Sequence, residues 1–106
     1  MKLKKGAVIQ GLQLPMRKVL MFADAIWKAN GKELVVTSGV DGVHSPGSLH
    51  PFGYAVDLRT FYFTNETKKK VRKLLADNLG PEYDVVLEPT HIHAEYQRVL
   101  DDYGGV

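Results

Sequence analysis

Residues 42–59, GVHSPGSLHPFGYAVDLR, hold two of the four histidines of the chain. The first part is rich in glycine and proline, which is typical of a loop. The second part, from residue 53 to residue 60, predicts a strand in which Asp57 stands between apolar neighbours. An unpaired carboxylate is costly to bury, so Asp57 needs a partner. Arg59, on the same strand face, is one candidate, and a divalent metal ion is the other.

The four histidines form two groups, His44 with His50 and His91 with His93. In a strand, alternate residues face the same way, so His91, His93 and Glu95 share one face. The apolar residues between them face the core, which leaves the histidines in a groove or on the open sheet face. His50, Asp57 and one histidine of the second pair would supply the nitrogen and oxygen ligands of a catalytic zinc site.

Length and composition limit the alternatives. A chain of 106 residues is enough for one domain with one core. With 44% hydrophobic and 25% charged residues, the composition is that of a globular protein, and a net charge of +2 does not require a nucleic-acid partner. The chain has no cysteine, which excludes disulfides and thiolate metal sites.

The N-terminal sequence MKLKKGAVIQGLQLP has the basic start of a secretory signal, but Gln10, Gly11 and Gln13 interrupt its apolar run. The apolar run at 19–23 is too short to span a bilayer. We therefore expect a protein made in the cytoplasm, without an export signal and without a membrane span.

Hydrophobic spacing predicts a helix over 14–30 and a second helix from Thr64 to the Gly80-Pro81 pair. The predicted inner faces are Val19, Phe22, Ala23, Ile26 and Trp27 in the first helix and Val71, Leu74, Leu75 and Leu79 in the second. The basic run at 68–73 falls on the outer face of the second helix without interleaved aromatic residues. It predicts a solvated surface, and we expect a monomer with no nucleic-acid partner.

Four strands are predicted, at 33–38, 53–60, 83–88 and 91–97. The last two form either a tight hairpin or one strand bent at Pro89. These elements predict an α+β domain over residues 1–106. It has a small, mainly antiparallel sheet, two helices on one face and a zinc cleft on the other.

The segment SLHPFGYAVD, from Ser48 to Asp57, resembles the SxHxxGxAxD motif of the zinc D-alanyl-D-alanine carboxypeptidase and L-alanyl-D-glutamate endopeptidase family, which includes the Hedgehog amino-terminal domain. His91-Ile-His93 resembles the HxH motif that closes the family pattern. Short members from phages and prophages are the most similar in length.

The resemblance implies that His50, Asp57 and His93 bind zinc. It also implies that His91 polarises the substrate carbonyl or stabilises the oxyanion. Ser48 would brace the loop or bond a substrate carbonyl.

A general base is also needed. Family members carry a carboxylate three residues before the second zinc histidine, where this chain has Thr90. Glu88 is the nearest carboxylate upstream and is our predicted base, because a bend at Pro89 would bring it round. Glu95 is the alternative, since it shares the face of His93.

Carboxypeptidase members also read SGYR after the first strand, with the arginine holding a substrate carboxylate, where residues 38–41 here read SGVD. Arg59 would take over this contact, or the enzyme would cut internal bonds and need no such contact. His44 matches a histidine near the zinc of Hedgehog-like members and would line the cleft or bond backbone.

The function implied is zinc-dependent hydrolysis of an amide bond in peptidoglycan stem peptides, of D,D-carboxypeptidase or L,D-endopeptidase type. Such an enzyme would reach the bacterial cell wall during phage lysis, as an endolysin does, or within a phage particle. The rival hypothesis is a non-catalytic zinc module on the same scaffold. A metal-free basic protein that binds the wall or nucleic acid is the third.

Overall fold

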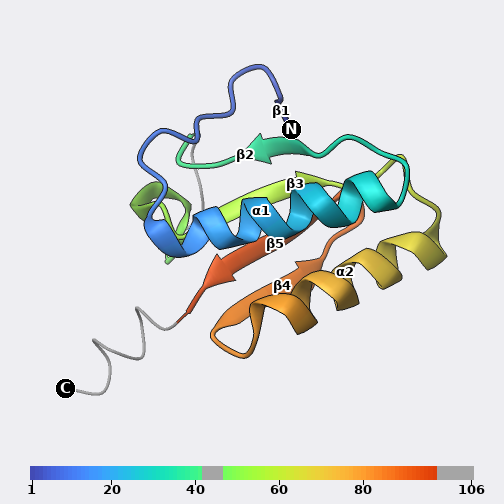
Figure 1. Ribbon diagram of the computed structural model, residues 1–106. Coiled ribbons are helices and arrows are strands. Elements are labelled where there is room, and N and C mark those ends of the chain that lie inside the picture. The colour runs from blue at the N-terminus through green and yellow to red at the C-terminus, as the bar shows by residue number, and fades with distance from the viewer. Residues whose placement is uncertain (42–46, 98–106) are drawn as a thin grey trace.

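The computed structural model describes residues 1–41 and 47–97, in which two helices pack on a five-stranded sheet of order β1-β2-β3-β5-β4 (Figure 1). The elements are β1 (Lys2–Leu3), α1 (Leu14–Ala29), β2 (Val35–Ser38), β3 (Ala55–Arg59), α2 (Asn65–Leu79), β4 (Tyr83–Leu87) and β5 (His91–Tyr96). Strand β1 is parallel to β2, and the other pairings are antiparallel. The α+β class is confirmed.

Strands β4 and β5 form a tight hairpin, which decides between the two predicted arrangements around Pro89. Val86 lies opposite His93, and the backbone N–H of Glu88 donates to the carbonyl of His91 at 2.8 Å. Strand β1 was not predicted, because two exposed residues carry no periodic signal.

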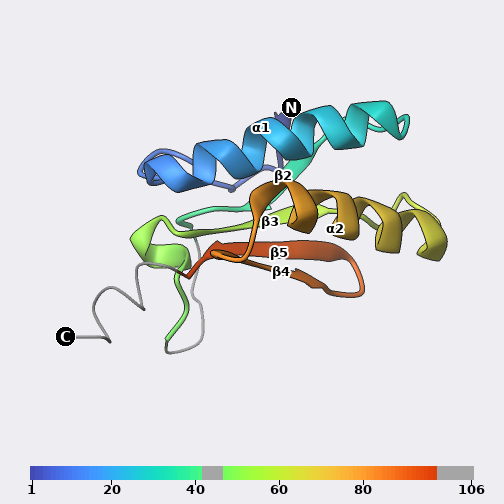
Figure 2. The same cartoon turned by 60° about the horizontal axis from the view of Figure 1, so that its bottom comes forward.

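Both helices cover the same face of the sheet, as the view in Figure 2 shows. The core consists mainly of Met16, Val19, Ala23, Ile26 and Trp27 from α1, Val71, Leu75 and Leu79 from α2, and Val56, Leu58, Ile92 and Ala94 from the sheet. Leu74 was predicted on the inner face, but it is 37% exposed because the buried stripe of α2 follows the other three positions. Phe22 packs only partly against the core.

Two local contacts explain where the elements sit. The Thr64 hydroxyl accepts a hydrogen bond from the backbone N–H of Thr67 at 3.1 Å and so caps the start of α2. The indole Nε1 of Trp27 donates to the carbonyl of Arg59 at 2.9 Å. This bond joins the buried face of α1 to the last residue of β3.

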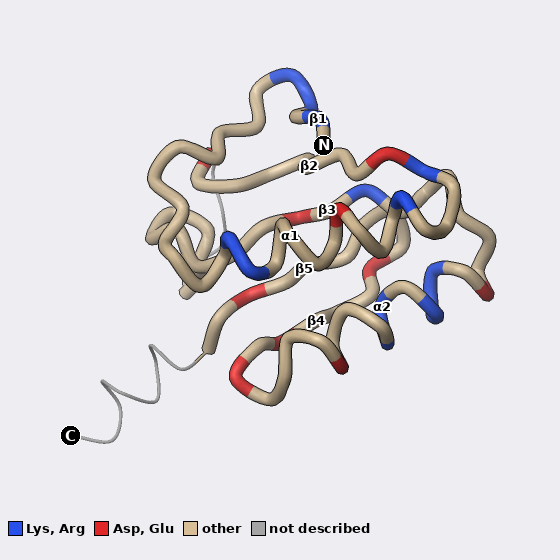
Figure 3. The backbone as a smooth tube through the Cα atoms, in the orientation of Figure 1, with Lys and Arg blue, Asp and Glu red and all other residues tan. Residues whose placement is uncertain are grey.

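The basic run of α2 faces outward, as predicted. Lys69, Lys70 and Lys73 are exposed while Val71 is buried, and Figure 3 shows the Lys and Arg positions along the helices. Neither helix in the described part of the chain has the length and apolar character needed to cross a membrane.

Candidate metal centre

Strand pairing brings the two halves of the predicted motif together. Asp57 of β3 lies directly opposite His93 of β5. The chain neighbours of Asp57 are Val56 and Leu58, those of His93 are Ile92 and Ala94, and all four are buried in the core beneath the helices. Strand alternation therefore places Asp57 and His93 on the opposite, open face. His50 begins the short 3₁₀ helix η1 (His50–Phe52) just before β3.

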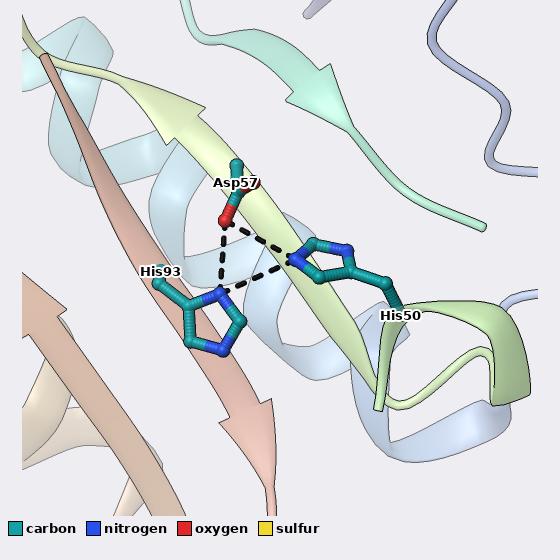
Figure 4. Close-up of side chains that lie close together, drawn as sticks. All are labelled: His50, Asp57 and His93. Atoms are coloured by element: carbon teal, nitrogen blue, oxygen red, sulfur yellow. Dashed lines mark hydrogen bonds and ion pairs between the residues drawn. The ribbon is translucent and has the colours of Figure 1, made fainter. Parts of the chain in front are cut away.

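Three side-chain atoms converge at this point (Figure 4). The Oδ1 atom of Asp57 lies 2.9 Å from Nδ1 of His93 and 3.4 Å from Nε2 of His50. The two ring nitrogens are 3.3 Å apart. Among the residues described, this is the group of histidines and carboxylates whose ligand atoms could hold one metal ion.

The His50 ring is held from behind. It is only 3% exposed, and its Nδ1 lies 2.8 Å from the carbonyl oxygen of Gly39. A carbonyl oxygen can only accept, so Nδ1 carries the proton and donates. In neutral His50 the lone pair is then on Nε2, which faces Asp57 and His93.

The His93 ring is held in the same way, by a carboxylate. Its Nε2 lies 2.8 Å from Oε1 of Glu95, and Oε2 of Glu95 accepts from the side-chain amide of Gln97 at 3.2 Å. The Nε2 atom therefore donates, and the lone pair of neutral His93 is on Nδ1. A metal-binding histidine commonly donates its second ring N–H to a carbonyl or a carboxylate.

As a result, three atoms with lone pairs face one another: Nε2 of His50, Oδ1 of Asp57 and Nδ1 of His93. In the metal-free protein a proton on His93 relieves their repulsion: the hydrogen bond to Asp57 raises the pKa of His93, burial opposes the rise and Glu95 adds to it, giving a pKa of about 9. Burial by itself would raise the pKa of Asp57, but its interactions with the neighbouring His50 and His93 rings outweigh burial and hold that pKa well below 3.8.

A metal ion would relieve the same repulsion. Two ligand atoms that bind one tetrahedral zinc ion are separated by roughly 3.4 Å. The three separations here, from 2.9 to 3.4 Å, are close to that value. The chemistry and spacing of the donors thus fit a metal ion held by His50, Asp57 and His93.

His91 lies at the border of this group. Its Nε2 is 3.8 Å from Oδ1 of Asp57, and its Nδ1 is 3.1 Å from the hydroxyl of Thr90. Three histidine rings therefore surround one carboxylate oxygen. Arg59, the other candidate partner of Asp57, forms no ion pair with it within the described ranges, and its guanidinium lies 5.1 Å from the ring centre of Phe61.

A hollow of about 300 Å³ opens beside Asp57 and His91. Its lining also includes the cations Lys4 and Arg59, the hydroxyls of Thr37, Ser38 and Thr90, and the ring of Phe61. A larger hollow, of about 480 Å³, lies beside the end of α1 and contains none of the predicted site residues. The smaller hollow is therefore the one that adjoins the candidate metal centre.

The other predicted residues have varied positions. The Ser48 hydroxyl accepts a hydrogen bond from the backbone N–H of His50 at 3.2 Å, which braces the loop. Glu88 lies in the β4–β5 turn and lines a separate hollow with Asn65 and Lys68, and its carboxylate has no hydrogen bond or ion pair to the three ligand residues in the described structure. His44 lies outside the described residues.

Sequence reasoning missed the carbonyl of Gly39 and the side chain of Lys4. Neither has a periodic or motif signal, because a backbone carbonyl acts independently of residue type and Lys4 comes from the far end of the chain. Glu95 was singled out, but as a possible base.

Comparison of the sequence with models of protein families gave no match, and comparison with curated proteins gave none either.

Proposed function

We propose that this protein is a zinc-dependent peptidase that hydrolyses an amide bond in peptidoglycan stem peptides. One observation carries the proposal: Nε2 of His50, Oδ1 of Asp57 and Nδ1 of His93 converge while partners behind both rings fix the outer nitrogens. These residues occupy the positions that the motif resemblance assigns to zinc. A scaffold of the Hedgehog and D,D-peptidase type belongs to the same proposal.

In this proposal His50, Asp57 and His93 hold the ion. When bound, zinc supplies Lewis-acid polarisation of a carbonyl and a nucleophilic water at neutral pH. Glu95 keeps the His93 ring in place through Nε2. Because both oxygens of Glu95 already accept hydrogen bonds, we assign it to orientation and not to proton transfer.

His91 is the proposed electrophilic partner of the scissile carbonyl. If the Thr90 hydroxyl donates to Nδ1, the proton of neutral His91 is on Nε2, which lies on the Asp57 side of the ring. A hydrogen bond from Nε2–H would strengthen as negative charge develops on the carbonyl oxygen.

Arg59 and Lys4 are the proposed contacts for a substrate carboxylate. Both line the hollow beside the metal centre, and neither forms an ion pair with an acidic residue inside that hollow. A guanidinium can bind a carboxylate in bidentate fashion. Ser48 stays a predicted substrate contact through its remaining hydroxyl proton.

Glu88 is the proposed proton carrier. Its backbone N–H donates to the carbonyl of His91, so it lies in the turn that leads into the strand of His91 and His93. The experiment that tests this role compares the zinc-loaded protein with Glu88→Gln on purified peptidoglycan, with Glu66→Gln on the exposed side of α2 as the matched control. We expect Glu88→Gln to abolish release of peptide fragments while its zinc content stays at one per chain.

The rival is a non-catalytic zinc module. Two observations favour it: Thr90 stands at the usual position of the base, and the Glu88 carboxylate has no contact with the ligand residues in the part of the chain described. Stoichiometric zinc without hydrolysis of any wall chemotype would support the module and reject the peptidase. If His50→Ala and Asp57→Ala left wall binding intact, the metal-free binder would be favoured instead.

A further inference from the structure

A segment near the N-terminus, residues 7–13, packs against two short stretches of backbone, one at residues 39–40 and one at Gly53, which lie on either side of His50 in the sequence. We call this segment the strap. The N–H of Val40 donates to the carbonyl of Val8 at 2.8 Å, and the N–H of Gln13 donates to the carbonyl of Gly53 at 2.9 Å. The strap thus contacts the chain both before and after the His50 loop.

The contact is backbone to backbone, which only glycine allows. A Cβ atom on Gly39 would collide with the carbonyl oxygen of Val8, and one on Gly53 would collide with that of Gly11. Gly53 also has a φ of 80°, in the left-handed region that favours glycine. Gly39 and Gly53 therefore pack directly against the backbone of the strap.

Asp41 ties the strap to Gly39. Its Oδ1 accepts from the N–H of Val8 and from the N–H of Gly39, both at 2.7 Å. Short hydrogen bonds from backbone N–H groups to an ionised carboxylate are among the stronger ones in proteins. Val8 and Asp41 are 33 positions apart, so this one oxygen joins distant parts of the chain.

Gly39 links Asp41 to the metal centre. Its N–H is held by Asp41, and its carbonyl oxygen accepts from Nδ1 of His50 at 2.8 Å. A change in the orientation of this residue would remove the acceptor that keeps the proton of His50 on Nδ1. A share of the His50 rings would then carry the proton on Nε2, and in that form Nε2 has no lone pair for a cation.

We propose that Asp41 is a positioning residue of the metal centre: by fixing Gly39, it keeps His50 in the Nδ1–H form with Nε2 directed at Asp57 and His93. The proposal rests on the metal site of the proposed function, but it does not depend on peptidase activity. It also gives Asp41 a role at the position where the resembling carboxypeptidases carry arginine.

The test uses the full chain with Asp41→Asn and Asp41→Glu. Asp77→Asn, which removes a similar charge from the exposed side of α2, is the control. Zinc affinity is measured by competition with a chromophoric chelator. The histidine tautomers of the zinc-free proteins are read from long-range proton–nitrogen NMR correlations of the imidazole rings.

We expect Asp41→Asn to bind zinc about 10- to 100-fold more weakly, the usual cost of losing an outer-shell partner. The His50 signals should change from one Nδ1–H form to a mixture, while the Glu95-bound His93 keeps its pattern. Asp41→Glu keeps the charge and should fall between wild type and Asn. Asp77→Asn should match wild type in both measurements.

A purely structural role for Asp41 would lower the melting temperature but leave zinc affinity and the His50 tautomer of the folded protein unchanged. That result would overturn the proposal. If Asp41→Asn does not fold, wild-type zinc affinity and tautomer in Asp41→Glu would overturn it equally. Failure of the wild-type protein to bind zinc would reject the proposed function, while the tautomer measurement on zinc-free protein would still decide the role of Asp41.

Discussion

The two faces of β3 carry opposite chemistry. Val56 and Leu58 point under the helices and are fully buried, whereas Asp57 and Arg59 lie on the open face beside the candidate metal centre. A shift of one residue in register would exchange the two sets. Burial of the apolar set therefore specifies which side chains reach the site, so the core and the metal centre depend on the same register.

The largest effect on stability is expected on the buried face. Leu58→Ala removes a fully buried side chain and should lower the free energy of unfolding by about 2–5 kcal/mol. Urea unfolding measures this loss. The folded fraction should still bind zinc in a 1:1 ratio, and loss of zinc from folded protein would show that the two faces are not separable.

On the open face, the main effect of a substitution is expected to be on zinc binding. Zinc at a hundredfold excess over its dissociation constant should stabilise the wild-type protein by about 2.7 kcal/mol. Asp57→Ala removes the oxygen shared by the three histidines, so this zinc-dependent stabilisation should disappear. Thermal unfolding with zinc and with a chelator measures the difference. Asp77→Ala, on the far side of the sheet, should keep it.

A change in pH should have opposite effects on the zinc affinity of the site and on the stability of the zinc-free protein. Zinc must displace the proton of His93, whose pKa is about 9, so zinc affinity should fall about tenfold for each unit of pH below that value. Competition titrations at several pH values measure the slope. A flat profile would contradict the assignment of His93 as a ligand.

In the zinc-free protein, the stability that His93 contributes should decrease as the pH rises. The pKa of His93 is raised from 6.5, so its contribution to stability is complete below pH 6.5 and is lost as the pH rises through about 9. The pKa of Asp57 is lowered, so its contribution is complete above pH 3.8 and is lost in acid. Urea unfolding with chelator should therefore show maximal stability from this pair near pH 5, and His93→Gln should flatten the alkaline decline.

The smallest effect on stability is expected far from both the buried residues and the open-face residues of β3. Thr64→Ala removes the side-chain cap of α2 and should cost about 1 kcal/mol of stability. Because the cap lies on the helix side of the sheet, zinc affinity should stay at the wild-type value. Thermal unfolding and the chelator titration together check this. A weaker zinc site in Thr64→Ala would mean that α2 supports the open face directly.

Much of the architecture was accessible from local pattern. The two helices, four of the strands and the shared face of His91 and His93 follow from periodicity and spacing, because each depends on residues close in sequence. The set of His50, Asp57 and His93 was implied by the motif resemblance, and it joins residues that are up to 43 positions apart. Local pattern did not choose between the hairpin and the bent strand at Pro89. It also missed β1, whose pairing with β2 depends on residues more than 30 positions away.

The sequence by itself determined that Asp57 and the two histidines of β5 lie on the open face, since strand alternation places them opposite the core. Only the tertiary structure decided how they are held. The partners of the outer nitrogens, Gly39 and Glu95, and the link from Gly39 through Asp41 to the strap, arise from the path of the chain in space. Hydrogen bonds between distant backbone groups require the folded geometry, and a residue pattern does not record them.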